Sequence, residues 1–360
     1  FDEVYHAPTS IAYSENNPAA YDPFAAPPEE GTAYDWLHPP LAKLIQATSI
    51  KIFGNNPTGW RMASVVVGTA IIPATFFLAL VTFGPVTAVF AAIVIAFENM
   101  NLTMSRIAMN DVFITFFSIV AFIFLVRYLK EGYLLKQILL ASLFAGLAWA
   151  SKWPGLYAVF CVFGIASVTT ILSRKFNWKI ILVFAIPPII YLLSYGQFWA
   201  QGHTVRQFID LHKQIWWYQN RHDLTHPYGT TPLFCVPDGI NGEKTFCPWI
   251  FDTRPVYFSY EAYGEKAGYI YNLGNPLVFW FGVFSVSFFI GGFLQYRRRE
   301  YLPIILGYFI FWLPWIFSPR ILFLHHYLPS IPFMSAMIGY MLFAQYKSNL
   351  KLVGFAVLIL

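Results

Sequence analysis

The sequence predicts an all-α polytopic membrane protein. Of its 360 residues, 57% are hydrophobic and only 11% are charged, whereas a soluble protein carries roughly 25% charged residues. The apolar residues gather in long stretches without Asp, Glu, Lys or Arg, such as 62–97 and 267–296. A membrane-spanning helix needs about 20 such residues. This composition excludes a soluble cytosolic enzyme, a nucleic-acid-binding module and a disordered chain.

Nine spans and the start of a tenth follow from these stretches. The run 62–97 is too long for one span and holds Gly84-Pro85 near its middle, where we expect a tight turn between two helices. Two short spans are extended by flanking cations such as Arg127 and Lys130, which can snorkel. The predicted spans are 60–82, 86–105, 112–129, 136–152, 154–173, 179–199, 275–295, 301–318 and 321–344, with a tenth from about 351.

The charges orient these spans. Six spans separate the first 59 residues from the segment 200–274, so both lie on the same side, and 14 of the 18 acidic residues fall in them. The short turns on the other side are basic, which places them in the cytoplasm. Their cations are Arg127, Lys130, Lys136, Arg174, Lys175, Lys179, Arg297, Arg298, Arg299, Lys347 and Lys351. The predicted regions are an extracytoplasmic segment 1–59, six spans in 60–199, an extracytoplasmic loop 200–274 and the C-terminal spans in 275–360.

The two outer segments carry further patterns. After Pro39-Pro40, apolar residues recur at helical spacing over 41–52, which predicts an amphipathic helix lying on the outer leaflet. In the large loop, Cys235 and Cys247 face an oxidising compartment and either form a disulfide or remain free thiols. Aromatic clusters in the same loop either bind substrate or form an interfacial belt.

Four basic residues remain at the outer ends of predicted spans. They are Arg61, Arg106, Lys152 and Arg320. One such cation alone is usually a snorkelling anchor, but ionisable groups at this depth are functional candidates. Together with Asp2, Glu3 and His38 they indicate a site for a lipid-linked phosphate, level with the bilayer edge. Arg106 has a second interpretation, as a structural salt bridge with Asp111, five residues later.

A series of short motifs, in order along nearly the whole chain, resembles the protein O-mannosyltransferase family. The Asp-Glu pair alone carries little information, but the full set is specific. The motifs are Phe1-Asp2-Glu3, His38-Pro39-Pro40-Leu41-Ala42-Lys43, Trp60-Arg61, Ser105-Arg106-Ile107-Ala108-Met109-Asn110-Asp111, Lys152-Trp153-Pro154-Gly155-Leu156, Thr225-His226-Pro227-Tyr228, Arg254-Pro255, Gly274-Asn275-Pro276 and Pro319-Arg320 followed by His325-His326-Tyr327-Leu328-Pro329.

The resemblance implies a glycosyltransferase C-type fold of about eleven spans, ten of them seen here. It also implies transfer of mannose from polyprenyl-phosphate mannose to Ser or Thr of secreted or membrane proteins on the extracytoplasmic face. The family's acidic pair follows its first span, so Phe1 would begin just after a missing helix. The loop 200–274 is too short for the lumenal β-trefoil domain of eukaryotic members. In this respect the chain resembles a prokaryotic enzyme of the plasma membrane. The chain departs from the family pattern at 229–247.

The reaction and the resemblance together suggest roles. The acceptor hydroxyl needs a carboxylate base, for which Asp2 is the candidate. We expect Glu3 to point away from Asp2 in an extended segment and to orient the acceptor or a nearby Arg. The charge growing on the phosphate needs preorganised cations, with Arg61 and Arg320 ranked before Lys152 and Arg106. Candidates for substrate binding or site support are His38, which would cap or position the surface helix, and Asp111, His226, Arg254, His325, His326 and Tyr327.

No metal or other cofactor is expected beyond the lipid-linked donor. There is no Asp-x-Asp motif, and the pair His222 and His226 is followed directly by Pro227 and has no obvious third ligand. Two alternatives stay open. One is a transferase of the same fold that moves another sugar from polyprenyl phosphate to a lipid or glycan. The other, more remote, is a secondary transporter, which nearly charge-free mid-span regions and the lack of an internal repeat disfavour.

Overall fold

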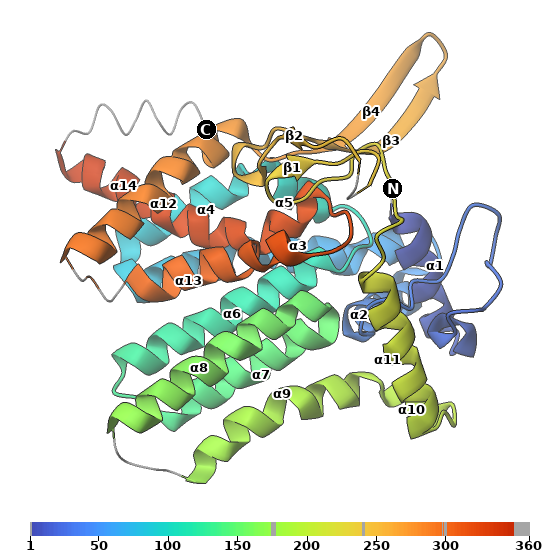
Figure 1. Cartoon of the computed structure of the whole chain (residues 1–360), viewed down its shortest axis with the longest axis horizontal. Helices are drawn as coiled ribbons and strands as arrows, with labels where there is room; N and C mark the ends of the chain where they lie inside the picture. Colours follow the sequence, from blue (N-terminus) through green and yellow to red (C-terminus); the bar gives the residue numbers. More distant parts are fainter. Residues whose placement is uncertain (1, 174–177, 240–241, 297, 299–300, 349–360) are drawn as a thin grey trace.

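The computed structural model describes residues 2–173, 178–239, 242–296, 298 and 301–348. Its helices lie along the long axis of the molecule, with α1, α2, α11 and two β-hairpins gathered at one end (Figure 1). Within this part of the chain, five helical segments are long and apolar enough to cross a membrane. They are built on α3 (Pro57–Phe83), α6 (Asp111–Lys130), α8 (Leu156–Ser173), α12 (Pro276–Tyr296) and α14 (Ile331–Ser348).

Four shorter apolar helices complete the bundle: α4 (Pro85–Ala96), α7 (Leu135–Ser151), α9 (Ile181–Ser194) and α13 (Leu302–Ile310). Each of the nine predicted spans contains one helix of these two groups, and the tenth span lies outside the described residues. The turn at Gly84-Pro85 is confirmed, because α3 ends at Phe83 and Gly84 has a positive φ of 102°. Glycine adopts that conformation without steric penalty.

The span predicted at 86–105 is interrupted. Glu98 is fully buried between α4 and α5 (Asn99–Met104), and its side chain accepts hydrogen bonds from the backbone N–H groups of Asn101 and Asn275. A buried carboxylate needs such partners. The break therefore ties the end of α4 to the start of α12.

The N-terminal segment forms a helix, α1 (Glu3–Ser14), so the extended conformation expected around Asp2 and Glu3 is wrong. Pro8 removes one helical N–H donor, and the carbonyl of Val4 that loses this donor accepts a hydrogen bond from the N–H of Ala33 instead. The helix packs on α2, where Ser10 donates to Gln46. Tertiary contacts of this kind override the proline signal.

The predicted surface helix is present as α2 (Leu41–Phe53), with an inverted amphipathic pattern. Its polar residues Lys43, Gln46 and Ser49 are buried in the protein, whereas Ile52 and Phe53 are 69% and 48% exposed, beside the exposed Lys51. Exposed apolar side chains of this kind can contact lipid. The position of α2 at the outer leaflet remains a prediction.

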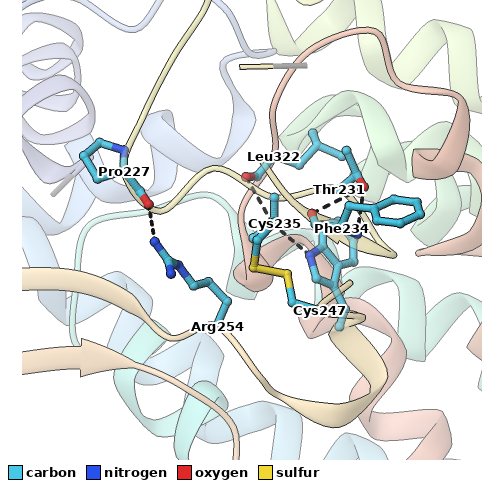
Figure 2. Close-up of a disulfide and its surroundings, with 9 residues drawn as sticks. Pro227, Thr231, Phe234, Cys235, Cys247, Arg254 and Leu322 are labelled. Atoms are coloured by element: carbon cyan, nitrogen blue, oxygen red, sulfur yellow. Dashed lines mark hydrogen bonds between the residues drawn. A yellow bond between two sulfur atoms is a disulfide. The ribbon is translucent and has the colours of Figure 1, made fainter. Parts of the chain in front are cut away.

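The large loop is folded. It contains α11 (Val205–Gln219), a short hairpin of β1 (Phe234–Cys235) and β2 (Thr245–Phe246), and a longer hairpin of β3 (Val256–Tyr263) and β4 (Lys266–Asn272) that projects from the molecule (Figure 1). The disulfide between Cys235 and Cys247 is confirmed and links β1 to the residue directly after β2 (Figure 2). Reciprocal backbone hydrogen bonds between Thr230 and Leu322, each 2.8 Å, fasten this loop to the segment that follows Arg320.

Candidate active site

A cavity of about 530 Å³ opens where α1, α11 and the segment 314–326 meet. Its walls come from both ends of the chain and from the turn after α7. Of the residues expected to form a site, it brings together Asp2, His38, Lys152, Arg320, His325 and His326.

Asp2 lies directly before α1 and lines the cavity. An Asp at this position commonly accepts a hydrogen bond from the first helical turn, but the Asp2 side chain makes no such capping bond, and its backbone is already helical. Burial raises the pKa of Asp2, although the charges of His6 and Lys152 act in the opposite direction. A carboxylate whose pKa is raised toward neutrality is a stronger general base.

Glu3 points to the other side of α1, away from the cavity. Its Oε1 and Oε2 accept hydrogen bonds from Nε and Nη2 of Arg61, at 2.8 and 2.5 Å, and Oε1 also accepts from the N–H of Ala108 at 2.9 Å. Burial would raise the pKa of Glu3, but these bonds hold it below its usual value. Glu3 orients an arginine, one of its two expected roles, and Arg61 is not among the described residues that line the cavity.

Lys152 and Asp111 form a buried ion pair. Lys152 Nζ donates to Oδ1 and Oδ2 of Asp111 at 2.8 and 3.0 Å, and the two residues are 5% and 2% exposed. The turn after Lys152 depends on Gly155, where a Cβ atom would lie 2.2 Å from the carbonyl carbon of Ala148. Asp111 therefore pairs across 41 residues, and the alternative salt bridge with Arg106, which is exposed, is wrong.

Arg320 forms the cationic wall of the cavity. Its Nη1 donates to Gln219 Oε1 at 2.8 Å, and its guanidinium carbon lies 5.5 Å from the ring centroid of Tyr218. Among the described residues, no carboxylate lies within ion-pair distance of Arg320. A guanidinium that no carboxylate pairs with directly can stabilise negative charge on a bound ligand.

The histidine candidates differ in position. His325 and His326 stack at a ring-centroid distance of 4.7 Å, and His326 Nδ1 lies 3.0 Å from the carbonyl oxygen of Phe323. His38 lies parallel to His6 at 6.0 Å in the cavity wall. It does not cap α2, whose N-cap is Pro40, so that part of the expectation is wrong.

Three further candidates lie outside the cavity wall. Tyr327 is fully buried and its hydroxyl pairs with that of Tyr308 at 2.5 Å, so it belongs to the core. The His226 ring lies 5.0 Å from that of Phe323, which lines the cavity. Arg254 donates a hydrogen bond of 2.5 Å to the Pro227 carbonyl oxygen; Figure 2 draws this contact. No group of three or more His, Cys, Asp or Glu residues in the described chain is placed to hold a metal ion.

Asp35, Lys43 and His6 form a buried charge cluster next to the cavity that was not predicted from the sequence. The Asp35 carboxylate pairs with Lys43 Nζ and with His6 Nδ1, the latter at 3.0 Å. Burial alone would raise the pKa of Asp35, but Lys43, His38 and His6 hold it well below its usual range. The signal was available in part, because His6 lies one helical turn after Asp2. Neither the helix nor the partner could be read from that spacing alone.

A second missed group supports the opposite wall. Trp153 Nε1 donates to the Tyr191 hydroxyl at 3.0 Å, and that hydroxyl lies 2.8 Å from His212 Nε2. These contacts join the turn after α7 to α9 and α11. No sequence signal indicates them, because the three residues lie far apart along the chain.

Two family profiles together match nearly the whole chain. One, described as dolichyl-phosphate-mannose-protein mannosyltransferase, matches residues 37–194, and the other, the C-terminal four-transmembrane region of protein O-mannosyltransferase, matches residues 204–360. The chain belongs to the protein O-mannosyltransferase family. It is a glycosyltransferase and an integral membrane protein.

Similar proteins agree with this family. A polyprenol-phosphate-mannose–protein mannosyltransferase of Corynebacterium glutamicum is 24% identical over 363 residues, covering 84% of this chain and 69% of that protein. The enzyme of the same name from Mycobacterium tuberculosis is 21% identical over 388 residues, covering 88% and 70%. The chain thus spans about 70% of the length of these relatives.

Solved structures show the fold. The S. cerevisiae protein O-mannosyltransferase Pmt1-Pmt2 complex bound to the sugar donor matches with a TM-score of 0.74 at 13% identity, covering 99% of this chain and 85% of that one. ArnT from Cupriavidus metallidurans bound to undecaprenyl phosphate matches with a TM-score of 0.55 at 14% identity, covering 95% and 55%. The predicted glycosyltransferase C-type fold is confirmed.

Proposed function

We propose that this protein transfers mannose from polyprenyl-phosphate mannose to Ser or Thr hydroxyls of proteins, with Asp2 as the general base. One observation carries the assignment of the site. Asp2, whose side chain makes no capping bond, and Arg320, which pairs with none of the carboxylates that the structure describes, face the same cavity. Such a site can accept a proton at one wall and stabilise a phosphate at the other.

The reaction is a single displacement. The acceptor oxygen forms a bond to the mannose C1 while the bond between C1 and the phosphate oxygen breaks, and its electron pair leaves with the polyprenyl phosphate. Asp2 accepts the proton of the hydroxyl. Attack opposite the leaving group inverts C1, so a β-linked donor gives an α-linked product.

We assign the growing charge of the phosphate to Arg320. Arg61 remains a candidate from the sequence, but its guanidinium is committed to Glu3. Lys152 uses two hydrogen bonds for Asp111. An ammonium has three N–H donors, so one remains for a ligand in the cavity that Lys152 lines.

We place the site on the extracytoplasmic face of a prokaryotic plasma membrane. The basic residues Arg127 and Lys130 at the end of α6 and Lys136 at the start of α7 support this orientation. So does the disulfide of the large loop, since disulfides persist in oxidising compartments. Secreted or membrane proteins would then be the acceptors.

Mass spectrometry of an acceptor peptide, incubated with enzyme and defined polyprenyl-phosphate sugars, tests this function. Mannose should be added to Ser or Thr, and transfer of another sugar or modification of a lipid would favour the related transferases instead. The Asp2→Asn variant should lose at least about 100-fold in rate, within the range of general-base catalysis, and keep its donor affinity. Glu15→Gln, at an exposed carboxylate next to the end of the same helix, is the control. A normal rate for Asp2→Asn would refute the base.

A further inference from the structure

We infer that one face of the β3–β4 hairpin is a docking track for an extended acceptor polypeptide, leading from the cavity rim outward. The inference rests on the proposed function, because a protein acceptor must reach the base. The proposed surface lies on a hairpin that projects from the molecule and contains none of the proposed catalytic residues (Figure 1).

The hairpin sorts its side chains into two different faces. Cross-strand pairing of Tyr257 with Tyr271 and of Tyr260 with Tyr269 places these four tyrosines together on one face, with a register shift between Tyr257 and Ser259. Neighbouring rings on this face lie 5.2–6.4 Å apart. Tyr260, Tyr269 and Tyr271 are 49%, 58% and 40% exposed, so the rings are available to a ligand.

The tyrosine face, defined as Tyr257, Tyr260, Tyr269 and Tyr271, continues to the cavity. Tyr257 stacks with Tyr228 at 6.1 Å, and Tyr228 lies 5.8 Å from His226. The His226 ring in turn lies 5.0 Å from Phe323, a residue of the cavity wall. An unbroken series of rings therefore runs from the cavity to the outer part of the hairpin.

The chemistry of this face fits a peptide. Tyrosine rings pack on proline and aliphatic side chains, and their hydroxyls hydrogen-bond to backbone groups. Arg254, whose guanidinium carbon lies 5.6 Å from the centroid of Tyr228, adds a donor at the inner end. An extended peptide advances by about 3.3 Å per residue. A face made of four tyrosines therefore suits an extended segment rather than a single amino acid.

A lipid surface is the less favoured occupant. The outer end of the hairpin carries Glu261, Glu265 and Lys266, all exposed. Charged groups at the tip oppose insertion into the hydrocarbon region. Binding a polypeptide from solution does not require these charged groups to leave water.

The experiment compares a long acceptor peptide, with about 15 residues flanking a single Thr, with a five-residue acceptor of the same central sequence. The double variant Tyr260→Ala/Tyr269→Ala should raise the KM of the long peptide about 10-fold, with the kcat, the KM of the short peptide and the KM of the donor unchanged. Tyr263→Ala is the matched control, because Tyr263 is 66% exposed on the same strand and pairs with Lys266 on the opposite face.

Three outcomes would overturn the inference: an unchanged KM for the long peptide, an equal loss with both peptides, or a loss seen only in vesicles and not in detergent, which would assign the face to the membrane. Wild-type enzyme that transfers no mannose to either peptide would instead refute the proposed function. Circular dichroism and unfolding temperature of the double variant check that the hairpin mutations leave the fold intact.

Discussion

The two ends of the chain handle their charges differently. In the N-terminal segment Glu3 pairs with Arg61 and Asp35 with Lys43, so each of these charges is neutralised locally. Arg320, from the C-terminal half, forms no ion pair with a described carboxylate and instead contacts Gln219, Tyr218 and the carbonyl oxygen of Ile321. Position near the bilayer edge is therefore not enough to identify a cation as a phosphate ligand. We propose that a cation can bind the phosphate only where its carboxylate partner, if it has one, leaves a donor directed at the cavity.

The comparison also holds between adjacent residues. Asp2 and Glu3 follow one another, yet Asp2 lines the cavity and Glu3 lies in an ion pair on the other side of α1. Helical geometry turns successive side chains by about 100°. One helix start thus supplies both a candidate base and a structural anchor.

The largest expected effect concerns a buried pair. Lys152→Met leaves Asp111 charged and unpartnered in the interior, which typically destabilises a protein by about 3–5 kcal/mol. We expect a large loss of unfolding temperature in detergent, and partial rescue by the double variant Lys152→Met/Asp111→Asn. Lys213→Ala, which breaks an exposed pair with Asp210, should change little. Normal stability of Lys152→Met would mean that the pair is not a structural element.

The two arginines provide the sharpest test of the comparison. Arg320→Gln should raise the donor KM by at least about 10-fold, because it removes a charge-assisted contact to phosphate. Arg61→Gln should reduce stability by about 1 kcal/mol, as expected for a partly exposed pair, with a smaller effect on the donor KM. Steady-state kinetics with varied donor distinguishes them. The reverse ranking would return Arg61 to the phosphate site and remove Arg320.

The pH profile tests the role of Asp2. A base must be ionised, so activity should fall as pH decreases through its pKa. Because burial raises this pKa above the ordinary value of 3.8, the acid limb of kcat/KM should lie at higher pH than for an exposed Asp. Glu3, whose pKa is lowered, should not contribute to it. An identical limb in Glu15→Gln and no remaining limb in Asp2→Asn would support the assignment, whereas a limb below pH 3.8 would contradict it.

The smallest effect on catalysis is expected from removing the disulfide between Cys235 and Cys247 in the large loop. The disulfide closes a loop with a sequence separation of 12, for which chain entropy predicts a stabilisation of about 3 kcal/mol. Cys235→Ser/Cys247→Ser should increase proteolysis of this loop, with less than about a 2-fold change in rate on a five-residue acceptor. Limited proteolysis with and without reductant measures this. A complete loss of activity would show that the loop shapes the cavity directly.

Much of the fold could be predicted because the helices are encoded locally. Runs of apolar residues and the Gly84-Pro85 turn reflect the surrounding lipid and the backbone, and both act over short stretches of chain. The α1 helix was not predicted. Its Pro8 removes a helical N–H donor, and the hydrogen bond that replaces it comes from Ala33. Propensity cannot reveal a partner that far along the chain.

Six of the residues expected from the sequence line one cavity, but which residues pair with one another could not be predicted. Asp111 has Arg106 five residues away, yet it binds Lys152, brought close by the packing of α6 on α7. Tyr327 adjoins two cavity histidines in the sequence but points into the core, since it lies on a tight 3₁₀ segment, Leu324–Ser330. Neighbours in a motif share a function only when the local backbone turns them to the same side.

The origin of the cavity walls has a consequence for how the enzyme is made. Asp2 lies at the start of the chain and Arg320 in its last third. At a synthesis rate of about 5–20 residues per second, Arg320 is added to the chain many seconds after Asp2. A stalled or prematurely terminated chain therefore carries half a site. Until residue 320 has been synthesised, the nascent chain lacks the arginine that we assign to the phosphate.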